Sequence, residues 1–473
     1  MRCVVFVSAL LLPLAASAND LMKVYELAVT NDPTYLAAQF ARDANVEARP
    51  LALAPLLPQL NGAYKPAKDH FEFTPPPGTL TPAECANAGQ PAGCTVTLTS
   101  SNRPYTVSLT LSQSIFDWSA FETYSQAGDT AALAEVSFRA AQQNLLLRVA
   151  QAYFAVLTAA DTLRASRAEN KALERQLEQA RKRFDVGLSA ITDVQEAQAR
   201  YDLTTATVID AERTFHSSRE ALAAITGTNT IGLSSVQEDI GVPNPDPLNV
   251  AKWTEVALAE NLDLAAAKLN TSIAKKGIWI ARGGYLPTVN IVGQGTNGQS
   301  SGFNRGYYED RQYMLNVNVP IFAGLSTWHT VNRAQSTHGQ RQAEELGTRR
   351  AVERTTHDAY QAVLSGASRV KALKQAVLSN TTALQASQVG LQVGARTNVD
   401  VLNAQQLLYS AQRDYASARY NYLVSVLTLK NAAGRLTQND LQEIDRLLVS
   451  CPPPASTFAA PSAEDSICTV GTD

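Results

Sequence analysis

Apolar residues recur every three to four positions over two very long stretches of the chain. A ladder that steps alternately by four and three residues from Leu145 to Phe184 is apolar at ten of its twelve positions. The same ladder displaced by 207 residues, from Val352 to Leu391, is apolar at eight of twelve. Heptad spacing sustained over this length predicts a coiled-coil helix in each stretch.

A turn and a second helix are expected after each long helix. Gly187 and Gly394 follow the two ladders, where glycine commonly ends a helix. The first long helix should begin near Ser119, with Asp117 as its cap, and would measure about 100 Å. The second helices are expected at 192–225 and 399–433. The pattern predicts two tall antiparallel helical hairpins, and by itself it indicates no chemistry.

Other segments alternate strictly between apolar and polar residues, as in Tyr105, Val107 and Leu109. This alternation predicts four strands, near 58–66, 104–116, 287–296 and 312–322. Four strands are too few to close a barrel of useful bore, whereas three chains would bring about twelve, which is within the range of outer-membrane barrels. Tyrosines near the strand ends, such as Tyr64 and Tyr313, suit either an aromatic girdle or ordinary loop packing.

An internal duplication organises the chain. Segment 151–157 resembles segment 358–364, which lies 207 residues later. Both copies contain a Leu-Pro pair and, further along the chain, an Ile-Phe pair. The two Leu-Pro pairs are 229 residues apart, whereas the two Ile-Phe pairs are 206 residues apart. The difference places an insertion of 23 residues in the first copy, within a proline-rich stretch. We therefore interpret the chain as one duplicated unit rather than as a string of unrelated domains.

The predicted organisation follows from these patterns. It comprises a signal peptide (1–18), a first repeat (19–227, with an external loop at 67–103 and long helices at 119–226), an inter-repeat equatorial linker (228–252), a second repeat (253–434, with an external loop at 297–311 and long helices at 325–433), and a C-terminal equatorial segment and tail (435–473).

The N-terminus and the cysteines indicate export. A basic start, a 13-residue mostly apolar run and an A-x-A motif that ends at Ala18 are typical of a secretory signal. The mature chain keeps four cysteines in two close pairs. In an oxidising compartment an even count predicts the disulfides Cys85–Cys94 and Cys451–Cys468, with free thiols as the alternative.

Composition limits the chemistry. The chain is 45% hydrophobic and 18% charged, with a formal net charge of −3, which excludes wholesale disorder and does not favour nucleic-acid binding. HExxH, CxxC and GxxxxGK[ST] motifs are absent from the sequence. Gly293–Gly298 does read GxGxxG, but the polar, glycine-rich residues after it are unsuited to the helix that a dinucleotide site requires. We expect no catalytic residues, no metal and no cofactor.

Several segments together resemble the TolC family of outer-membrane efflux and secretion channels. The likeness covers nearly all of the mature chain and is densest at 56–60, 111–117, 183–194, 393–402 and 418–423. It implies a mainly α fold with a transmembrane β part. It also implies a homotrimer. In this homotrimer a twelve-stranded barrel in the outer membrane of a Gram-negative bacterium continues into a periplasmic α-helical barrel.

The resemblance also implies a function and partners. Such a channel is an exit duct for drugs, small molecules or proteins, which reach it from an inner-membrane RND, ABC or MFS transporter through a periplasmic adaptor. The adaptor is expected to dock at the two hairpin tips. These residues are Val186, Gly187, Leu188, Ser189, Val393, Gly394, Ala395 and Arg396.

The gate residues are likewise implied by the resemblance. Asp400 matches a position of the family at which acidic residues form a ring. Asn403 occupies a position at which a family channel has a second aspartate. Arg396 and Asp193 match a charged pair that restrains the closed state, while Leu391 replaces a tyrosine of that state. Each of these charges also fits a solvated helix end.

Two other classes of protein share some of these features. A periplasmic coiled-coil scaffold or adaptor without a barrel would share the long helices, but an adaptor needs a lipoyl-like β domain and an inner-membrane attachment, which the pattern lacks. A secreted hydrolase would need a nucleophile, base or metal motif, and the sequence has none of the usual ones.

Overall fold

The computed structural model describes residues 20–76, 82–89, 95, 97–229, 233–237, 239–300 and 306–449. The predicted signal peptide and the predicted Cys451–Cys468 pair therefore lie outside the described residues. By its contacts the chain forms two compact units. The helical unit comprises Met1–Asp43, Ala134–Lys268 and Glu344–Asp473, and the sheet unit comprises Ala44–Leu133 and Leu269–Ala343. Each unit draws on both sequence repeats, so the duplication does not correspond to two separate globular halves.

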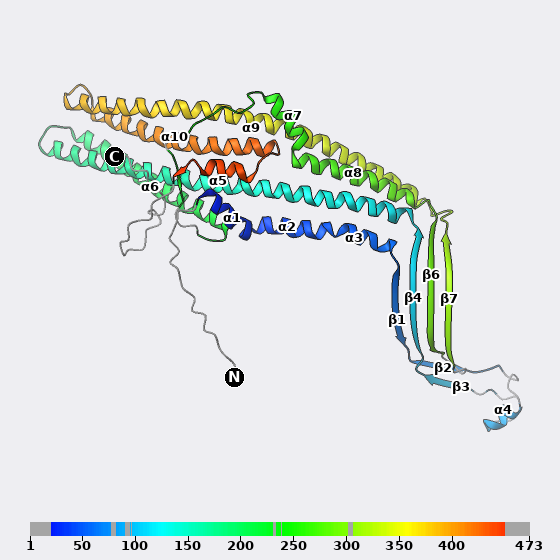
Figure 1. Cartoon of the computed structure of the whole chain (residues 1–473). Coiled ribbons are helices and arrows are strands. Elements are labelled where there is room, and N and C mark those ends of the chain that lie inside the picture. The colour runs from blue at the N-terminus through cyan, green and yellow to red at the C-terminus, as the bar shows by residue number, and fades with distance from the viewer. Residues whose placement is uncertain are drawn as a thin grey trace, which may run out of the picture. The chain divides into compact units, whose positions relative to one another are not determined.

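Four long helices dominate the chain (Figure 1). They are α5 (Trp118–Asp185, 68 residues), α6 (Ile191–Thr226), α9 (Ser326–Gln392, 67 residues) and α10 (Asn398–Ala432). Asp117 caps α5, because its Oδ1 accepts a hydrogen bond from the Ala120 N–H at 3.0 Å. In sequence order α5 and α6 form one hairpin, and α9 and α10 form the other.

Shorter helices precede the first and third strands of the main sheet, and they extend the duplication. They are α1 (Leu21–Asn31), α2 (Pro33–Val46), α3 (Ala48–Leu53) with the 3-10 turn η1 (Ala54–Leu56), α7 (Val250–Glu260) and α8 (Leu262–Gly283). The starts of α1 and α7 are 229 residues apart, as are those of α2 and α8. Asp32 and Asn261 occupy equivalent caps and accept from the N–H groups of Tyr35 and Leu264. Sequence analysis did not single out these helices.

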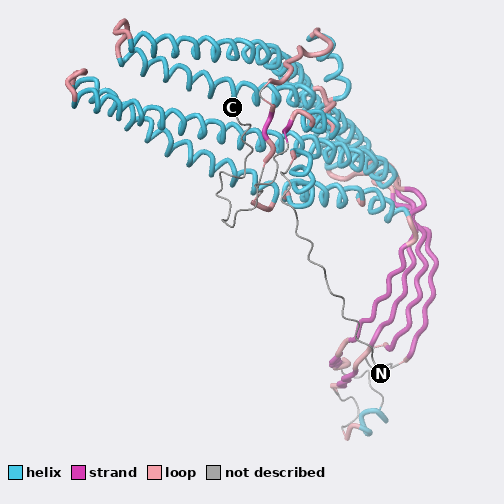
Figure 2. The backbone as a smooth tube through the Cα atoms, turned by 60° about the vertical axis from the view of Figure 1, so that its left-hand side comes forward, coloured by secondary structure: helices cyan, strands magenta, loops and turns pink. Residues whose placement is uncertain are grey.

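The sheet unit contains a four-stranded antiparallel sheet in the order β1–β4–β6–β7 (Figure 2). The strands are β1 (Gln59–Pro66), β4 (Tyr105–Phe116), β6 (Thr288–Gln299) and β7 (Tyr307–Asn318). The GxGxxG segment Gly293–Gly298 lies inside β6. The outer strands β1 and β7 are the two edges of this sheet.

The prediction of a strand near 312–322 was wrong in its bounds. The observed strand begins earlier, at Tyr307, because β6 extends to Gln299 and pairs with it there. It ends earlier because β6 begins at Thr288, which pairs with Asn318, and because Pro320 has no N–H to continue the ladder. The described part of the predicted external loop 297–311 is therefore largely strand.

The predicted external loop 67–103 is not wholly loop. It contains a second hairpin, β2 (Asp69–Phe73) paired with β3 (Leu98–Asn102), and the short helix α4 (Pro82–Asn87). Cys85 on α4 is buried and disulfide-bonded. Its predicted partner, Cys94, lies outside the described residues, so the pairing itself stays a prediction.

The linker and the C-terminal segment also carry secondary structure. Strand β5 (Ser235–Val236) from the linker pairs with β8 (Leu448–Val449), which follows α11 (Gln438–Asp445). Two segments predicted as equatorial thus join through one short ladder in the helical unit.

The main core of the helical unit is aromatic where α5 meets α10. Phe154 stacks on Tyr420 with ring centroids 5.8 Å apart, and both side chains are buried. The Tyr420 hydroxyl donates to Asp161 Oδ2 at 2.6 Å. Burial, followed by the nearby Asp161 charge, raises the pKa of Tyr420, so this hydroxyl stays protonated and remains a donor. Among the described residues, no helix is long and apolar enough to cross a lipid bilayer.

Candidate functional site

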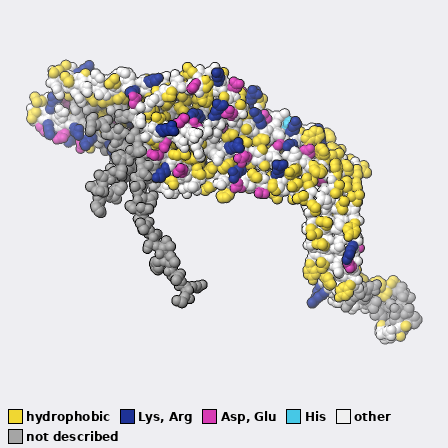
Figure 3. Space-filling view, viewed as in Figure 1, with side chains coloured by type: hydrophobic (Ala, Val, Ile, Leu, Met, Phe, Trp, Pro, Cys, Tyr) yellow, Lys and Arg dark blue, Asp and Glu magenta, His cyan; other side chains and the backbone are white. Residues whose placement is uncertain are grey.

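The main sheet has one apolar and one polar face. On β4, Val107, Leu109 and Leu111 alternate with small hydroxyl residues. The strand register places Leu111 opposite Leu60 of β1 and Gly293 of β6. The apolar face continues across all four strands, and hydrophobic side chains gather over these strands in Figure 3. Its exposed members are Leu60, Tyr64, Val107, Leu109, Leu111, Ile291, Tyr313, Leu315 and Val317.

Both edges of this sheet are unpaired within the described chain. Strand β1 is exposed along its whole length, and β7 is exposed at all positions but one. Free N–H and C=O groups along an edge strand are templates for pairing with another strand. An exposed apolar face on strands of 8 to 12 residues matches the length that crosses a bilayer as a barrel. The sheet is thus suited to be completed by strands of other chains.

The eight predicted docking residues lie in the two tight turns that end the hairpins. Gly187 and Gly394 have φ of 73° and 75°, which glycine adopts without strain. The Leu188 N–H donates to the Arg183 carbonyl at 2.8 Å, and the Ala395 N–H donates to the Gly390 carbonyl at 2.8 Å. These bonds define the same glycine-based helix end twice.

The tips present apolar side chains to solvent. Val186, Leu188 and Val393 are 68%, 75% and 74% exposed. Apolar side chains that gather on an exposed surface mark a site suited to a partner protein, and Val186 and Leu188 lie together at one tip. The structure thus brings Val186–Ser189 together at one tip and Val393–Arg396 together at the other.

Asp400 lies in the first turn of α10, where it forms a capping box with Thr397. The Thr397 N–H and hydroxyl both donate to Asp400 Oδ2 at 2.9 Å, and the Asp400 N–H donates to the Thr397 hydroxyl at 3.2 Å. The backbone hydrogen bond from Thr397, then that from its hydroxyl, holds the pKa of Asp400 below its usual range. The carboxylate is therefore ionised and held in place.

Asp193 occupies the equivalent position in α6 but is not held in this way. Its cap residue is Ala190, which has no side-chain oxygen, so no capping box forms. Both Asp193 and Arg396 line a polar recess of about 410 Å³ near the hairpin tips. Within the described chain, however, the ion pair of Arg396 is with Asp400, at 4.0 Å. The predicted pairing of Arg396 with Asp193 stays a prediction.

Polar contacts join the two hairpins within one chain. Arg413 of α10 pairs with the buried Glu169 of α5 at 2.6 Å. Gln176 of α5 donates to Asn398 at the start of α10. These contacts connect residues more than 200 positions apart, and no local motif in the sequence marks them.

A further contact between the hairpins involves the predicted gate residue Asn403. Arg200 of α6 donates from Nη2 to Asn403 Oδ1 at 2.9 Å and from Nη1 to Gln406 Oε1 at 2.7 Å. Asn403 and Gln406 are one turn apart on α10, so one planar guanidinium spans both amides. Sequence analysis named Asn403 but missed Arg200.

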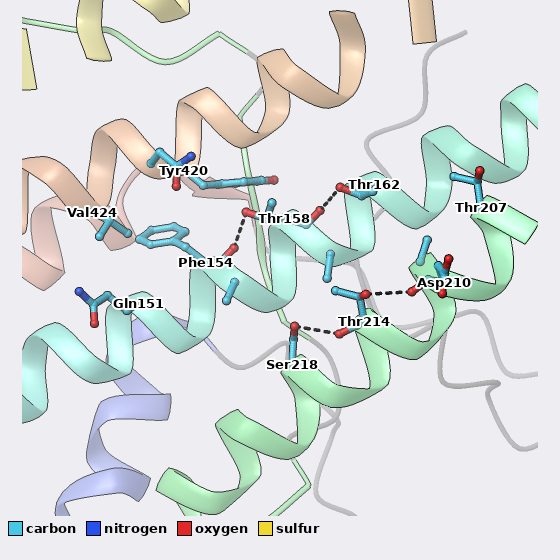
Figure 4. A pocket seen from close by; sticks show the side chains of 14 residues that line it. Gln151, Phe154, Thr158, Thr162, Thr207, Asp210, Thr214, Ser218, Tyr420 and Val424 are labelled. Carbon is cyan, nitrogen blue, oxygen red and sulfur yellow. Dashed lines mark hydrogen bonds between the residues drawn. The ribbon is translucent and has the colours of Figure 1, made fainter. Parts of the chain in front are cut away.

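A cavity of about 680 Å³ lies between α5, α6 and α10 (Figure 4). Its threonine hydroxyl groups are bonded within their own helices: Thr158 donates to the Phe154 carbonyl, and Thr214 donates to the Asp210 carbonyl. The wall is otherwise mostly small or apolar, with Phe154, Tyr420 and Val424 on one side. Among the described residues, no group of three or more histidine, cysteine or acidic side chains is placed to hold a metal ion.

Comparison with known proteins identifies the class to which this arrangement belongs. The sequence model of the outer membrane efflux protein family matches residues 24–228 and 253–435. These two segments cover most of both repeats. The chain therefore belongs to the outer membrane efflux protein family.

Individual relatives confirm the resemblance to TolC channels. The outer membrane protein TolC of Vibrio cholerae is 33% identical over 447 residues, which are 93% of this chain and 97% of the relative. The alkaline protease secretion protein AprF of Pseudomonas aeruginosa is 28% identical over 480 residues, covering 97% of this chain and 96% of the relative.

The fold is shared with solved channels. The Campylobacter jejuni CmeC outer membrane channel matches with a TM-score of 0.74 at 16% identity, covering 92% of this chain and 90% of that one. The mainly helical architecture with few strands is thus that of TolC-like channels. These relatives are channel and secretion proteins rather than enzymes.

Proposed function

We propose that three copies of this chain form an exit duct in the outer membrane. The observation that carries the proposal is the open four-stranded sheet with two free edges and an apolar face, in a chain of this family. Pairing β7 of one copy with β1 of the next would close a barrel of about twelve strands, within the range of bacterial outer-membrane barrels. The apolar face would contact outer-membrane lipid, and the polar face would line the lumen.

The long helices would extend the duct into the periplasm. Three copies of α5, α6, α9 and α10 supply the wall of a helical tunnel, and the hairpin tips form its inner end. The tips would dock a periplasmic adaptor, which couples the duct to an inner-membrane RND, ABC or MFS transporter. The duct itself would spend no energy, and its cargo would be drugs, small molecules or proteins.

The periplasmic end would be gated by polar links and an acidic ring. Three copies of Asp400 would place three carboxylates around the tunnel axis. Clustered carboxylates raise the local concentration of cations, so the entrance should favour cations. Arg396 and Asp193 would restrain the closed state. Because position 403 is Asn rather than Asp, the ring would carry three charges instead of six.

The alternative of a periplasmic scaffold without a barrel is less consistent with the sheet. A scaffold in water would leave Leu109, Tyr313 and Leu315 on one exposed apolar face and both edges unpaired. Natural proteins normally cover or charge such an edge, because it promotes aggregation.

Membrane extraction and planar-bilayer recording test the proposal. The full chain, expressed with its own signal, should need detergent for extraction and should sediment and cross-link as a trimer. The trimer should then form ion-conducting channels in a planar bilayer. A monomer that is released without detergent, or a trimer that conducts no ions, would contradict the proposed function.

A further inference from the structure

Arg200 brings a positive charge to the part of α10 that carries Asp400. Its side chain leaves α6 and binds the amide oxygens of Asn403 and Gln406 at 2.9 and 2.7 Å. A fork that donates from two nitrogens to two oxygens one helical turn apart fixes both the position and the direction of the guanidinium. The charge is therefore held against α10 rather than moving freely at the end of a long side chain.

This charge is not neutralised by an ion pair in the described chain. Both acceptors are neutral amides, and within the described residues no ion pair joins Arg200 to a carboxylate. On its own helix, Asp202 instead accepts a hydrogen bond from Gln198. The substitution at position 403 thus has two electrostatic consequences. It removes a carboxylate, and it leaves a guanidinium without the counter-charge that an aspartate would supply.

The guanidinium is close enough to Asp400 to matter. Asn403 follows Asp400 by three residues, which is a rise of about 4.5 Å, and side chains at this spacing are neighbours on a helix. Arg200 is in hydrogen-bond contact with Asn403, so the two charges are on the order of 10 Å apart. This separation is about one Debye length at 0.1 M salt, where screening is incomplete.

We propose that Arg200 is a selectivity-determining residue of the channel: held by Asn403 and Gln406, its charge offsets that of Asp400 and lowers the preference of the entrance for cations. The proposal rests on the proposed function, because it concerns the same constriction. Three copies would bring three guanidinium groups beside three carboxylates. Removing them should raise the permeability ratio of K⁺ to Cl⁻ roughly twofold at low salt, and the effect should vanish at 1 M salt.

The test is the reversal potential of the purified trimer in a planar bilayer under a KCl gradient near 0.1 M. Arg200→Gln should shift the potential toward cation selectivity, and Arg200→Lys, which keeps the charge, should stay close to the wild type. Arg213→Gln is the matched control. Arg213 is also on α6, but its ion pair is with Asp210 of the same helix, so its loss should leave the potential unchanged. Asn403→Asp should shift the potential in the same direction as Arg200→Gln.

The outcomes separate the inference from the proposed function. If the wild-type trimer forms no channels, the proposed function fails and the inference fails with it. If the wild type conducts and Arg200→Gln has the same reversal potential, only the inference is overturned. An equal shift in Arg213→Gln would also overturn it, because net charge rather than position would then decide. Should Arg200→Gln not assemble, Arg200→Met, which also removes the charge, takes its place, and an unchanged potential in that variant rejects the inference.

Discussion

Asp400 combines a structural and an electrostatic role in one side chain. Its carboxylate closes the capping box with Thr397, and it lies in the first turn of α10, where the helix dipole favours a negative charge. Because its folded-state pKa is lowered, this carboxylate stabilises the start of α10 above the pKa of an unfolded aspartate. The contribution is lost as the pH falls through the lower, folded-state value.

Replacing Asp400 by Asn should separate these two roles. Asp400→Asn removes the charge but keeps an oxygen that can accept from Thr397, so we expect most of the cation selectivity to vanish while the trimer stays folded and loses only the stabilisation that the charge gives to the start of α10. Asp440 is the matched control, because it forms the same capping box with Thr437 on α11. Asp440→Asn should leave the reversal potential unchanged. A wild-type potential in Asp400→Asn would place the carboxylate ring elsewhere.

Strong acidification of the wild-type channel should lower its cation selectivity, as we expect the substitution Asp400→Asn to do. The pKa of Asp400 lies below the usual aspartate value of about 3.9, so cation selectivity should persist on acidification to about pH 4. It should fall only as the pH passes through the lower pKa. Reversal potentials measured in a pH series check this, and a loss of selectivity centred between pH 5 and 7 would implicate a different group.

Arg396 is the second gate residue with a specific expected effect. Its proposed pairing with Asp193 of the other hairpin would lie at the recess that both residues line, and exposed ion pairs contribute only about 0–1 kcal/mol each. Three symmetric copies would nevertheless act together on one gate. We expect Arg396→Ser to raise single-channel conductance in planar bilayers. Arg183→Ser removes a different arginine from the same recess and should change conductance less. Equal effects would show that the recess responds to charge alone.

The hairpin tip is the element on which adaptor docking depends. Nothing lies within 4 Å of a Cβ built on Gly187 or Gly394, so a larger side chain there would point into open space. The positive φ would add strain of about 1–2 kcal/mol, which long helices should tolerate. The tips are therefore accessible to substitution without loss of the fold.

Gly187→Phe and Gly394→Phe should leave the trimer intact and reduce its cross-linking to the adaptor in intact cells. The added ring would occupy the surface that the partner needs. Gly241→Phe serves as a control, because Gly241 is exposed and equally open but lies in the linker. Undiminished cross-linking in both tip variants would show that the adaptor docks elsewhere.

For the whole molecule, the two faces of the sheet decide whether the trimer enters the membrane. Leu315 lies on the apolar face of β7, and its neighbour Asn316 points to the opposite face. An arginine on a lipid-facing position costs about 2–4 kcal/mol at the bilayer midplane. We therefore expect Leu315→Arg to lower the amount of trimer in the outer-membrane fraction, and Asn316→Arg to lower it much less. The same loss in both variants would show that neither face meets lipid.

Local periodicity explains why much of this protein could be predicted. A heptad stripe and a following glycine specify a helix and its end through contacts a few residues apart, so the long helices and the turns at Gly187 and Gly394 are evident without a structure. The capping box of α10 is also a local pattern, Thr397-Asn-Val-Asp400, which by its spacing alone indicates the start of a helix.

The sequence by itself determined the repeat, the hairpins, the two-faced strands and the family, because each is encoded by spacing within a short window or by long similarity. Tertiary structure alone decided where β7 begins and ends, since strand bounds depend on the pairing partner, which here is β6 and spans Thr288–Gln299. It also decided the contact of Arg200 with Asn403, which joins positions 203 residues apart. Such contacts depend on how two hairpins pack together, and no pattern within either hairpin carries that information.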